Sequence, residues 1–500
     1  MGALYSLFLV TVLLGLLCRY FIKKFSYWKN RNVPYVKPTS IFGNLYPVLA
    51  LKKTIGHWLQ EQYNECNSDY FGIYAFTQPM LVIKSPTMIK DIIVKDFSYF
   101  DNRTVVINQN DEIMANLLFT KSNPSWKRIR SKMTPVFSSG KLKLMFPLVL
   151  DEAQHLVDLL KQHHCSRPTE MKEIACKYTI NVIAKCAFAV NARTFENEHS
   201  EFRELGRKLF DPRLENRLRF FVARFFPGLM KFFDIYLVNP KISRTLQDIV
   251  TCVLHTRKEN TNAKEKDLID ILIDLKKSDK SEDKFSEIEL IAAAVNFFVA
   301  GFETVASTLA FILYELCLAP DIQERLREEI ISTVQGNDGN LTYDSLSDMK
   351  YLDLIILEGM RKYPVLPFID RRCNSDYKVP GTDLTIEKGT AIYIPLFGLH
   401  YDSKYFPNPE KFDPERFRNK TDLNCDGMYY IPFGSGPRNC IGGRFALMNM
   451  KIAISKILLN FECVRVAETP VPLVYETKSL VVASKVGLPL KLVPLEKLLF

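Results

Sequence analysis

The hydrophobic positions of the chain are concentrated in one long run at its start, residues 3–22, which contains a single charged residue, Arg19. About twenty helical residues are enough to cross the hydrocarbon core of a bilayer, so this run predicts a membrane-spanning helix. No lysine or arginine precedes the run, whereas Lys23 and Lys24 follow it, which predicts that the rest of the chain stays on the cytosolic side. The alternative, a cleaved signal peptide, needs a charged start and a small-residue cleavage site, and neither is clear here.

A second long apolar run lies in the middle of the chain and ends at Leu318, just before Pro320. Its start carries Ser286 and Glu289, which have the spacing of a helical capping box. The run would make a helix of about 33 residues, long enough to cross a membrane. Polar residues in its centre, such as Asn296, would be costly in lipid. We therefore predict a helix that crosses the core of a large folded domain.

Shorter patterns predict a mainly α-helical fold with smaller β-sheets, of the α+β class. Residues 145–275 follow a helical period over most of their length, and residues 70–95 alternate in two short runs that predict a hairpin with its turn at Gln78-Pro79. Residues 365–372 predict a strand, and residues 479–493 predict a terminal hairpin.

The composition and the positions of the prolines suggest that the chain has three parts. The anchor, residues 1–22, is followed by a basic, proline-containing linker over residues 23–45 and by one large domain over residues 46–500. The net charge of +10 suits an anionic membrane surface or an acidic protein partner, but it is not concentrated in a way that indicates nucleic acid. The 11 cysteines show no framework of paired spacings, so we expect them to be reduced.

One cysteine stands in unusual surroundings, in the loop from Phe433 to Arg444. Gly434 and Gly442, with a third glycine between them, allow strained backbone and close approach to a flat ligand. The N-terminal end of the helix that follows favours a thiolate at Cys440, and Arg438 supplies a cation suited to a carboxylate. An isolated cysteine is more often a small buried hydrophobic residue. No second cysteine or histidine has zinc-ligand spacing here, whereas a single thiolate fits heme iron.

This loop matches the pattern FxxGxRxCxG at every fixed position, and it resembles the heme-binding loop of the cytochrome P-450 superfamily. The resemblance implies that Cys440 is the axial ligand of the iron of heme b and that Arg438 binds a heme propionate. Phe433, Gly434 and Gly442 would shape the loop. The implied fold is a triangular helical domain around the heme with a long central helix, preceded by a transmembrane helix.

The middle of the long apolar run resembles the superfamily's oxygen-activation motif, AGxxT with an acid before the threonine. It reads Ala300-Gly301-Phe302-Glu303-Thr304. Gly301 removes side-chain bulk where a large ligand could press on the helix, and the resemblance implies that Glu303 and Thr304 steer protons toward dioxygen. Val305 departs from the hydroxyl residue that often comes next, which reduces the hydroxyl network but leaves the motif.

Three further residues resemble heme-propionate partners. Trp126 and Arg130 are four residues apart, so on a helix they share one face, and they match the WxxxR motif. Arg371 matches the position of another propionate-binding arginine. The basic residues near this motif form a solvated surface or a docking face for an acidic flavoprotein: Lys127, Arg128, Lys132, Lys141 and Lys143.

Glu358 and Arg361 are three residues apart with apolar flanks, which predicts a buried ion pair that needs further partners. They match the ExxR motif, whose third member by resemblance is Arg416. We expect these residues to carry structure rather than chemistry.

The resemblance covers the whole chain and is strongest to insect enzymes of the family-6 and family-9 type, many of which oxidise plant toxins and insecticides. It implies a microsomal monooxygenase of the endoplasmic reticulum membrane with its catalytic domain in the cytosol. The implied partners are NADPH–cytochrome P-450 reductase, cytochrome b5 as a second candidate, a lipophilic substrate and membrane lipid, with no nucleic acid. The aromatic stretch of residues 207–233 would roof the substrate pocket and dip into lipid, or would be core.

Three alternatives stay open at this point. A hormone or fatty-acid hydroxylase could share every motif named above. A heme-thiolate enzyme that rearranges hydroperoxides tends to lack the acid–threonine pair that Glu303 and Thr304 retain. A non-catalytic binder of lipophilic ligands would bind heme and ligand but release no product.

Overall fold

The computed structural model describes residues 2–39, 41–163, 167–259, 267–278, 285–418 and 427–495. The chain divides into two compact units. Unit 1 comprises Met1–Thr104, Pro367–Tyr405 and Asp426–Arg438. Unit 2 comprises Val105–Leu366, Phe406–Cys425 and Asn439–Phe500. Helices predominate, and the strands form small sheets, so the predicted mainly α class with smaller β-sheets is confirmed.

Unit 1 is built on a four-stranded sheet in the order β1-β2-β7-β4. The first two strands form the predicted hairpin, which is antiparallel, with Tyr70 opposite Ile83. Its turn lies at Phe76 and Thr77, so Gln78-Pro79 begins the second strand instead of making the turn. The strands of unit 1 are β1 (Tyr70–Ala75), β2 (Gln78–Ile83), β4 (Phe368–Arg372), β5 (Tyr377–Lys378), β6 (Thr385–Ile386) and β7 (Ala391–Pro395).

The strand predicted over residues 365–372 is shorter in the structure, since β4 begins only at Phe368. Pro367 directly precedes it, and a proline cannot donate a ladder hydrogen bond. The helices of unit 1 are α1 (Gly2–Phe25), α2 (Tyr46–Leu49), α3 (Ile55–Glu65), α4 (Pro86–Lys90) and α17 (Leu396–His400).

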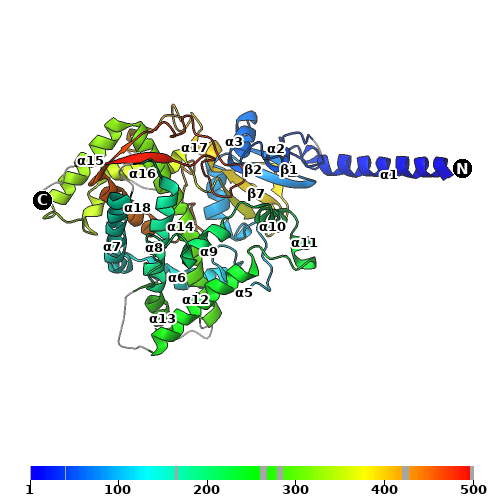
Figure 1. Ribbon diagram of the computed structural model, residues 1–500. Coiled ribbons are helices and arrows are strands. Elements are labelled where there is room, and N and C mark those ends of the chain that lie inside the picture. Colours follow the sequence, from blue (N-terminus) through cyan, green and yellow to red (C-terminus); the bar gives the residue numbers. More distant parts are fainter. Residues whose placement is uncertain are drawn as a thin grey trace. The chain divides into compact units, whose positions relative to one another are not determined.

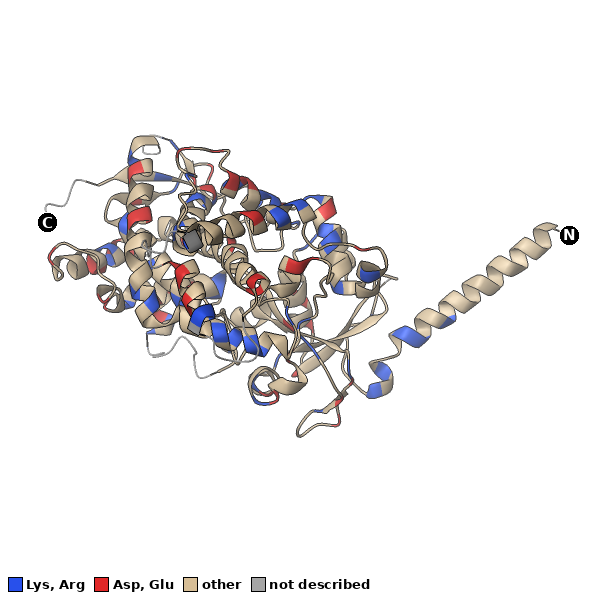
Figure 2. Cartoon of the chain, turned by 90° about the horizontal axis from the view of Figure 1, so that it is seen from below, with Lys and Arg blue, Asp and Glu red and all other residues tan. Residues whose placement is uncertain are grey.

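The N-terminal helix α1 is exposed along almost its whole length, as a membrane-spanning helix would be. Figure 2 shows that its charged residues lie only toward its C-terminal end. The helix continues to Phe25, three residues beyond the predicted anchor. The segment that follows is packed rather than free, because Trp28 is buried and its indole Nε1 donates to the carbonyl of Ile73, 3.2 Å away. The first part of the predicted linker therefore belongs to the core of unit 1.

Unit 2 contains most of the helices. They are α5 (Glu112–Asn116), α6 (Ser125–Met133), α7 (Ser139–His163), α8 (Met171–Phe188), α9 (Glu201–Leu209), α10 (Leu214–Phe225), α11 (Pro227–Phe232), α12 (Pro240–Glu259), α13 (Leu268–Ser278), α14 (Glu287–Leu318), α15 (Pro320–Gln335), α16 (Lys350–Lys362) and α18 (Gly443–Leu458).

The longest helix of unit 2 is α14, which packs along α8 (Figure 1). Its N-terminus has the predicted capping box, in which the Ser286 hydroxyl accepts from the Glu289 N–H and the Glu289 carboxylate accepts from the Ser286 N–H. The apolar part of the helix is 72% buried inside the protein, so the prediction of a core helix is confirmed.

The sheet of unit 2 has the order β3-β9-β8 and consists of β3 (Thr169–Glu170), β8 (Phe461–Val464) and β9 (Pro489–Pro494). The hairpin predicted over residues 479–493 is wrong, because β9 pairs with β8 and β3 instead of folding back on the residues before it. The cause is local. Gly487 adopts a left-handed φ of 81°, and the N–H of Leu488 donates to the Glu170 carboxylate, which ties this segment to the start of α8.

Candidate functional site

The cysteine loop has the tight turns that its glycines predict, but not at every glycine. Gly434 and Gly436 both have a φ of 70°, and a Cβ on Gly436 would lie 1.9 Å from the carbonyl oxygen of Ile93. Only glycine fits there. Gly442 has an ordinary φ of −92° and caps α18, so of the two uses expected for these glycines, strained backbone does not apply to it and close approach to a ligand stays a prediction. Cys440 is exposed and lies three residues before the first residue of α18.

The boundary between the two units falls inside this loop, between Arg438 and Asn439. On the unit 2 side, Arg130 of α6 holds the loop through two hydrogen bonds to Asn439, of 2.8 Å to the carbonyl oxygen and 2.6 Å to Oδ1. Burial lowers the pKa of Arg130, and the neighbouring Cys440 counteracts this. Trp126, one helical turn before Arg130, is buried. The structure thus brings Arg130 to the cysteine loop within unit 2.

On the unit 1 side, Arg371 of β4 is 1% exposed. Its Nη1 donates to the carbonyl of Asp370, 2.8 Å away, whereas its Nε has no hydrogen-bond partner among the described residues. Burial lowers the pKa of Arg371 to about 9, and the positive charges of Arg103 and Arg438 add to this effect. Arg438 is itself buried.

Sequence reasoning did not single out Arg103, which joins this group in the structure. Its Nη1 lies 3.2 Å from Oδ1 of Asp370, and the Thr104 N–H and hydroxyl both donate to the other carboxylate oxygen. More than 260 residues separate these partners in sequence. A pattern within one segment of the sequence cannot indicate such a pairing. Knowing which segments lie beside β4 would have been needed to predict it.

These residues fit a ligand that carries carboxylates. The Asp370 carboxylate pairs with Arg103, and the Nε of the buried Arg371 still lacks an acceptor among the described residues. A buried cation without full compensation is unfavourable, and an anion that binds it removes the penalty. The two propionates of heme have the required charge, and the thiol of Cys440 has the required donor atom for heme iron.

In unit 2, the middle of α14 shows an accessible face although the helix is buried on both sides of it. Ala300 is exposed and Thr304 is half-buried. The Thr304 hydroxyl donates to the carbonyl of Ala300 at 2.8 Å. A Cβ on Gly301 would lie 2.8 Å from Cδ1 of Ile183 on α8, so the glycine lets α8 approach closely. The expectation that a ligand also presses on Gly301 stays a prediction.

Glu303 points to a different neighbour from Thr304. Its carboxylate pairs with Lys172 of α8 at 2.8 Å, and the thiol of Cys176 donates to it at 3.7 Å. Among the described residues, no hydrogen bond joins Glu303 to Thr304. Val305 is buried. The sequence did not single out Lys172, because its relation to Glu303 depends on how two helices pack.

The structure also brings together Glu358, Arg361 and Arg416. Arg361 donates to both carboxylate oxygens of Glu358, at 2.7 and 2.9 Å, and Arg416 donates to Oε1 at 3.2 Å. Both members of the central pair are fully buried. The carboxylate of Glu358 also accepts a hydrogen bond from the N–H of Asp413 at 2.9 Å, so both of its oxygens are satisfied by protein donors.

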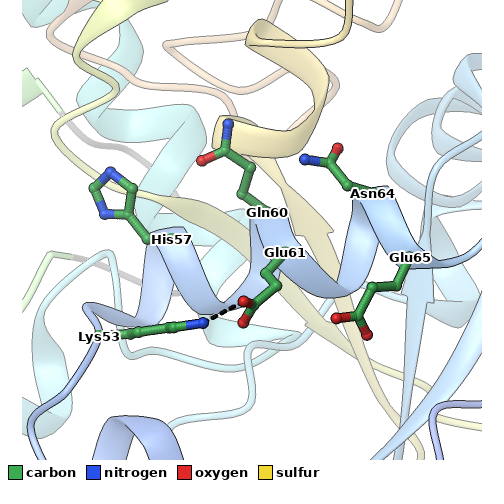
Figure 3. Close-up of a pocket in the computed structure, with 6 residues that line it drawn as sticks. All are labelled: Lys53, His57, Gln60, Glu61, Asn64 and Glu65. Carbon is green, nitrogen blue, oxygen red and sulfur yellow. Dashed lines mark hydrogen bonds and ion pairs between the residues drawn. The ribbon is translucent and has the colours of Figure 1, made fainter.

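A hollow on the surface of α3 is lined by none of these residues (Figure 3). Its lining comes from α3 and from the residue two positions before it: Lys53, His57, Gln60, Glu61, Asn64 and Glu65. Lys53 pairs with Glu61, and the His57 ring packs on Phe397. Because Lys53 and Glu61 neutralise each other and the hollow is open to solvent, we do not assign the site to it.

Comparisons with known proteins point to one family. The family model described as cytochrome P450 matches residues 33–490. Cytochrome P450 6k1 of Blattella germanica is 38% identical over 493 residues, which are 95% of this chain and 94% of that protein. Cytochrome P450 6j1 of the same organism is 40% identical over 91% of each chain. Cytochrome P450 9e2, also from Blattella germanica, is 35% identical over 89% of this chain and 90% of its own.

Proposed function

The chain belongs to the cytochrome P450 family of monooxygenases, and from this premise we propose that it inserts one atom of dioxygen into lipophilic small molecules, with electrons from NADPH delivered by a reductase. The family implies heme, dioxygen, a redox partner and a small-molecule substrate. The observation that carries the proposal is Cys440, exposed just before α18 in a loop that Arg130 holds in place.

Residues that match the family's motifs would hold the heme. Cys440 is the proposed iron ligand, and Arg130, Trp126, Arg371 and Arg438 are the proposed partners of the propionates. When bound, the heme supplies the activation of dioxygen, while the protein binds, orients and protonates. Phe433, Gly434 and Gly442 set the course of the loop, and Glu358, Arg361 and Arg416 support unit 2 without contacting substrate.

Proton delivery falls to the accessible face of α14. Thr304 is the side chain on this face that can hold and pass a proton, and its hydroxyl now donates to Ala300. Glu303 is the adjacent acid. Ala300 is exposed one helical turn before Thr304, so a small molecule could approach this face there. We propose Thr304 and Glu303 as the proton-relay residues.

Apolar side chains support a lipophilic substrate. Leu366 is 44% exposed and Leu480 is 40% exposed. The segments that carry them are held side by side, because the N–H of Val482 donates to the carbonyl of Val365. We propose foreign compounds such as plant toxins or insecticides as the substrate class, because of the likeness to insect family-6 and family-9 enzymes. An endogenous hormone or fatty acid is the second candidate class.

Basic residues on the surface of unit 2 support the proposal of an acidic reductase as the redox partner. Basic residues of α6 and the start of α7 would dock an acidic reductase, with cytochrome b5 as a second partner: Lys127, Lys132, Lys141 and Lys143. Arg128 is excluded from this face because its side chain is only 21% exposed and pairs with the buried Glu289 of α14.

Two regions support association with lipid. The apolar helix α1 is one. The other is the end of α11, where Phe232 and Phe233 are 81% and 64% exposed. Lys23 and Lys24 at the end of α1 favour a cytosolic catalytic domain. We propose that α1 is a single span in the endoplasmic reticulum membrane.

The test is the absorption spectrum of the reduced protein with carbon monoxide. We expect a strongly red-shifted Soret band that disappears in Cys440→Ala, together with product formation from NADPH and reductase. Cys252→Ala is the matched control, because Cys252 is also exposed but lies on α12. A band typical of histidine ligation would contradict the ligand assignment. Turnover with hydroperoxide alone would favour rearrangement, and spectral shifts without product would favour a binder.

A further inference from the structure

Residues 474–488, which we call the Leu480 loop, form a closed loop directly before β9 in unit 2. Inside the loop the backbone runs antiparallel to itself, with Tyr475 opposite Ser484. Backbone hydrogen bonds of 2.8 and 2.9 Å lie on either side of this bridge. The Ser484 hydroxyl also donates to the carbonyl of Gly487 at 2.6 Å, which closes the turn at the base of the loop. These bonds connect the base of the loop to its tip.

The tip of the Leu480 loop presents an apolar side chain to the outside. Leu480 is exposed, whereas Val481 and Val482 beside it are buried. The Val482 N–H donates to the carbonyl of Val365 at 3.0 Å, and Leu366, the next residue, is exposed like Leu480. The position of the tip therefore decides how Leu480 is placed beside Leu366.

Glu170 holds the base of the same loop. It ends β3 and is the N-cap residue of α8. Its Oε1 accepts from the Leu488 N–H at 2.9 Å and from the Lys172 N–H at 3.1 Å. Its Oε2 accepts from the Glu173 N–H at 2.5 Å, and the Met171 N–H donates to the carbonyl of Leu488 at 3.2 Å. One carboxylate thus joins the start of α8 to the base of the Leu480 loop.

The length of this side chain suits the second task better than the first. Short side chains such as aspartate are preferred at the N-cap, so capping α8 does not require a glutamate. The additional methylene brings the carboxylate to Leu488. Gly487 makes room for it, since a Cβ there would lie 3.1 Å from Cγ of Glu170 and 3.3 Å from its Oε1. The helix that carries Glu170 is mostly buried and packs along α14, so it offers a firm support.

We propose that Glu170 is a positioning residue that fixes the Leu480 loop from the start of α8 and thereby sets how lipophilic ligands fit against Leu480. It acts through the loop and not by touching the ligand. The proposal rests on the proposed monooxygenase function, in which Leu366 and Leu480 support a lipophilic substrate. It adds a residue that selects among substrates from outside the group of side chains that meet them.

The experiment compares Glu170→Ala and Glu170→Asp with Thr54→Ala. Thr54 is the matched control, because its hydroxyl caps α3 of unit 1 by accepting from the His57 N–H at 3.1 Å. Glu170→Asp keeps a good cap on α8 but shortens the reach to Leu488. It therefore separates the loop from the stability of the helix.

The first readout is hydrogen–deuterium exchange of the backbone amides of residues 474–488, which needs no turnover. In both Glu170 variants we expect this exchange to be about fivefold faster, the factor that corresponds to one net hydrogen bond. In Glu170→Asp the amides of α8 should exchange as in the wild type. In Thr54→Ala the Leu480 loop should be unchanged.

The second readout is the affinity for two azoles that shift the Soret band, clotrimazole and imidazole. Clotrimazole is bulky and lipophilic, so it reports on the apolar surroundings of the heme, whereas imidazole is too small to do so. In both Glu170 variants the Kd for clotrimazole should rise by about threefold to fivefold, again the range of one hydrogen bond. The Kd for imidazole should stay the same, and Thr54→Ala should match the wild type for both azoles.

The proposal is overturned if the Leu480 loop exchanges equally in Glu170→Asp and Thr54→Ala, a result that stands even where Glu170→Ala does not fold. It is also overturned if the loop exchanges faster but the Kd values for clotrimazole and imidazole keep their ratio. Failure of the proposed function looks different. In that case the Cys440-dependent Soret band is missing from the wild type, while the exchange data still show whether Glu170 holds the loop.

Discussion

Arg361 in unit 2 and Arg371 in unit 1 are both fully buried guanidinium groups, but their surroundings differ. Arg361 donates to both oxygens of Glu358 and, at 2.7 Å, to the carbonyl of Pro409. Arg371 donates to one carbonyl and keeps an Nε without an acceptor among the described residues. The nearest carboxylate, that of Asp370, is occupied by Arg103 and Thr104.

This difference separates two uses of buried charge. A buried pair whose donors and acceptors are satisfied holds the fold together but leaves no capacity for a ligand. A buried cation with an open donor costs stability in the free protein, and an anionic ligand can recover that cost. We therefore assign structure to the group around Glu358 and binding to the group around Arg371.

Removing the shared carboxylate of the first group should have the largest effect. Glu358→Gln leaves the buried Arg361 and the part-buried Arg416 without their counter-charge, and we expect it to lower the free energy of unfolding by about 3–5 kcal/mol. Chemical denaturation measures this. The matched control is Glu415→Gln, whose partners Arg325 and Arg418 are exposed, and it should cost about 1 kcal/mol or less. Equal losses in the two variants would contradict the contrast between buried and exposed pairs.

The second group should respond in the opposite way. Arg371→Met removes the uncompensated charge, so we expect the protein without heme to keep or gain stability, by about 1 kcal/mol. Affinity for heme should fall by about tenfold to a hundredfold, as for other residues that support a metal site from outside its ligands. Heme transfer to a stronger acceptor measures the affinity. Arg372→Met, on the next residue of β4, is the control and should retain heme.

The pH dependence sharpens this prediction. With a pKa of about 9, Arg371 is charged below that pH and loses its proton above it. An anionic ligand binds the charged form, so the affinity of the wild type for heme should fall as the pH rises through about 9. Arg371→Met has no such proton to lose and should lack this part of the pH dependence. Parallel pH profiles of the two proteins would remove Arg371 from the binding site.

The sequence was most informative where all partners of an interaction or motif lie within one short segment. The capping box of α14 is set by Ser286 and Glu289, three residues apart, and it was predicted correctly because both partners lie on one helical turn. The partnership of Glu358 and Arg361 was predictable for the same reason. The family resemblance depends on the loop around Cys440, which is likewise continuous in sequence.

The sequence was uninformative where partners come from distant segments. The contact between Lys172 and Glu303 depends on the packing of α8 on α14, and Gly301 proved to serve that packing. The pairing of β9 with β8 could not be distinguished from a local hairpin, because alternation along a strand does not identify its neighbour.

An exposed pair completes the series and should show the smallest effect on stability. Lys143 and Asp344 lie 2.8 Å apart, but their side chains are 59% and 76% exposed. Lys143→Gln should change the free energy of unfolding by less than about 0.5 kcal/mol. If the basic face docks the reductase, the same variant should raise the KM for reductase by about threefold at low salt, because a rim charge acts mainly on association. High salt should abolish the difference. Lys491→Gln, on β9, is the control, and an equal KM for both variants at low salt would contradict docking at Lys143.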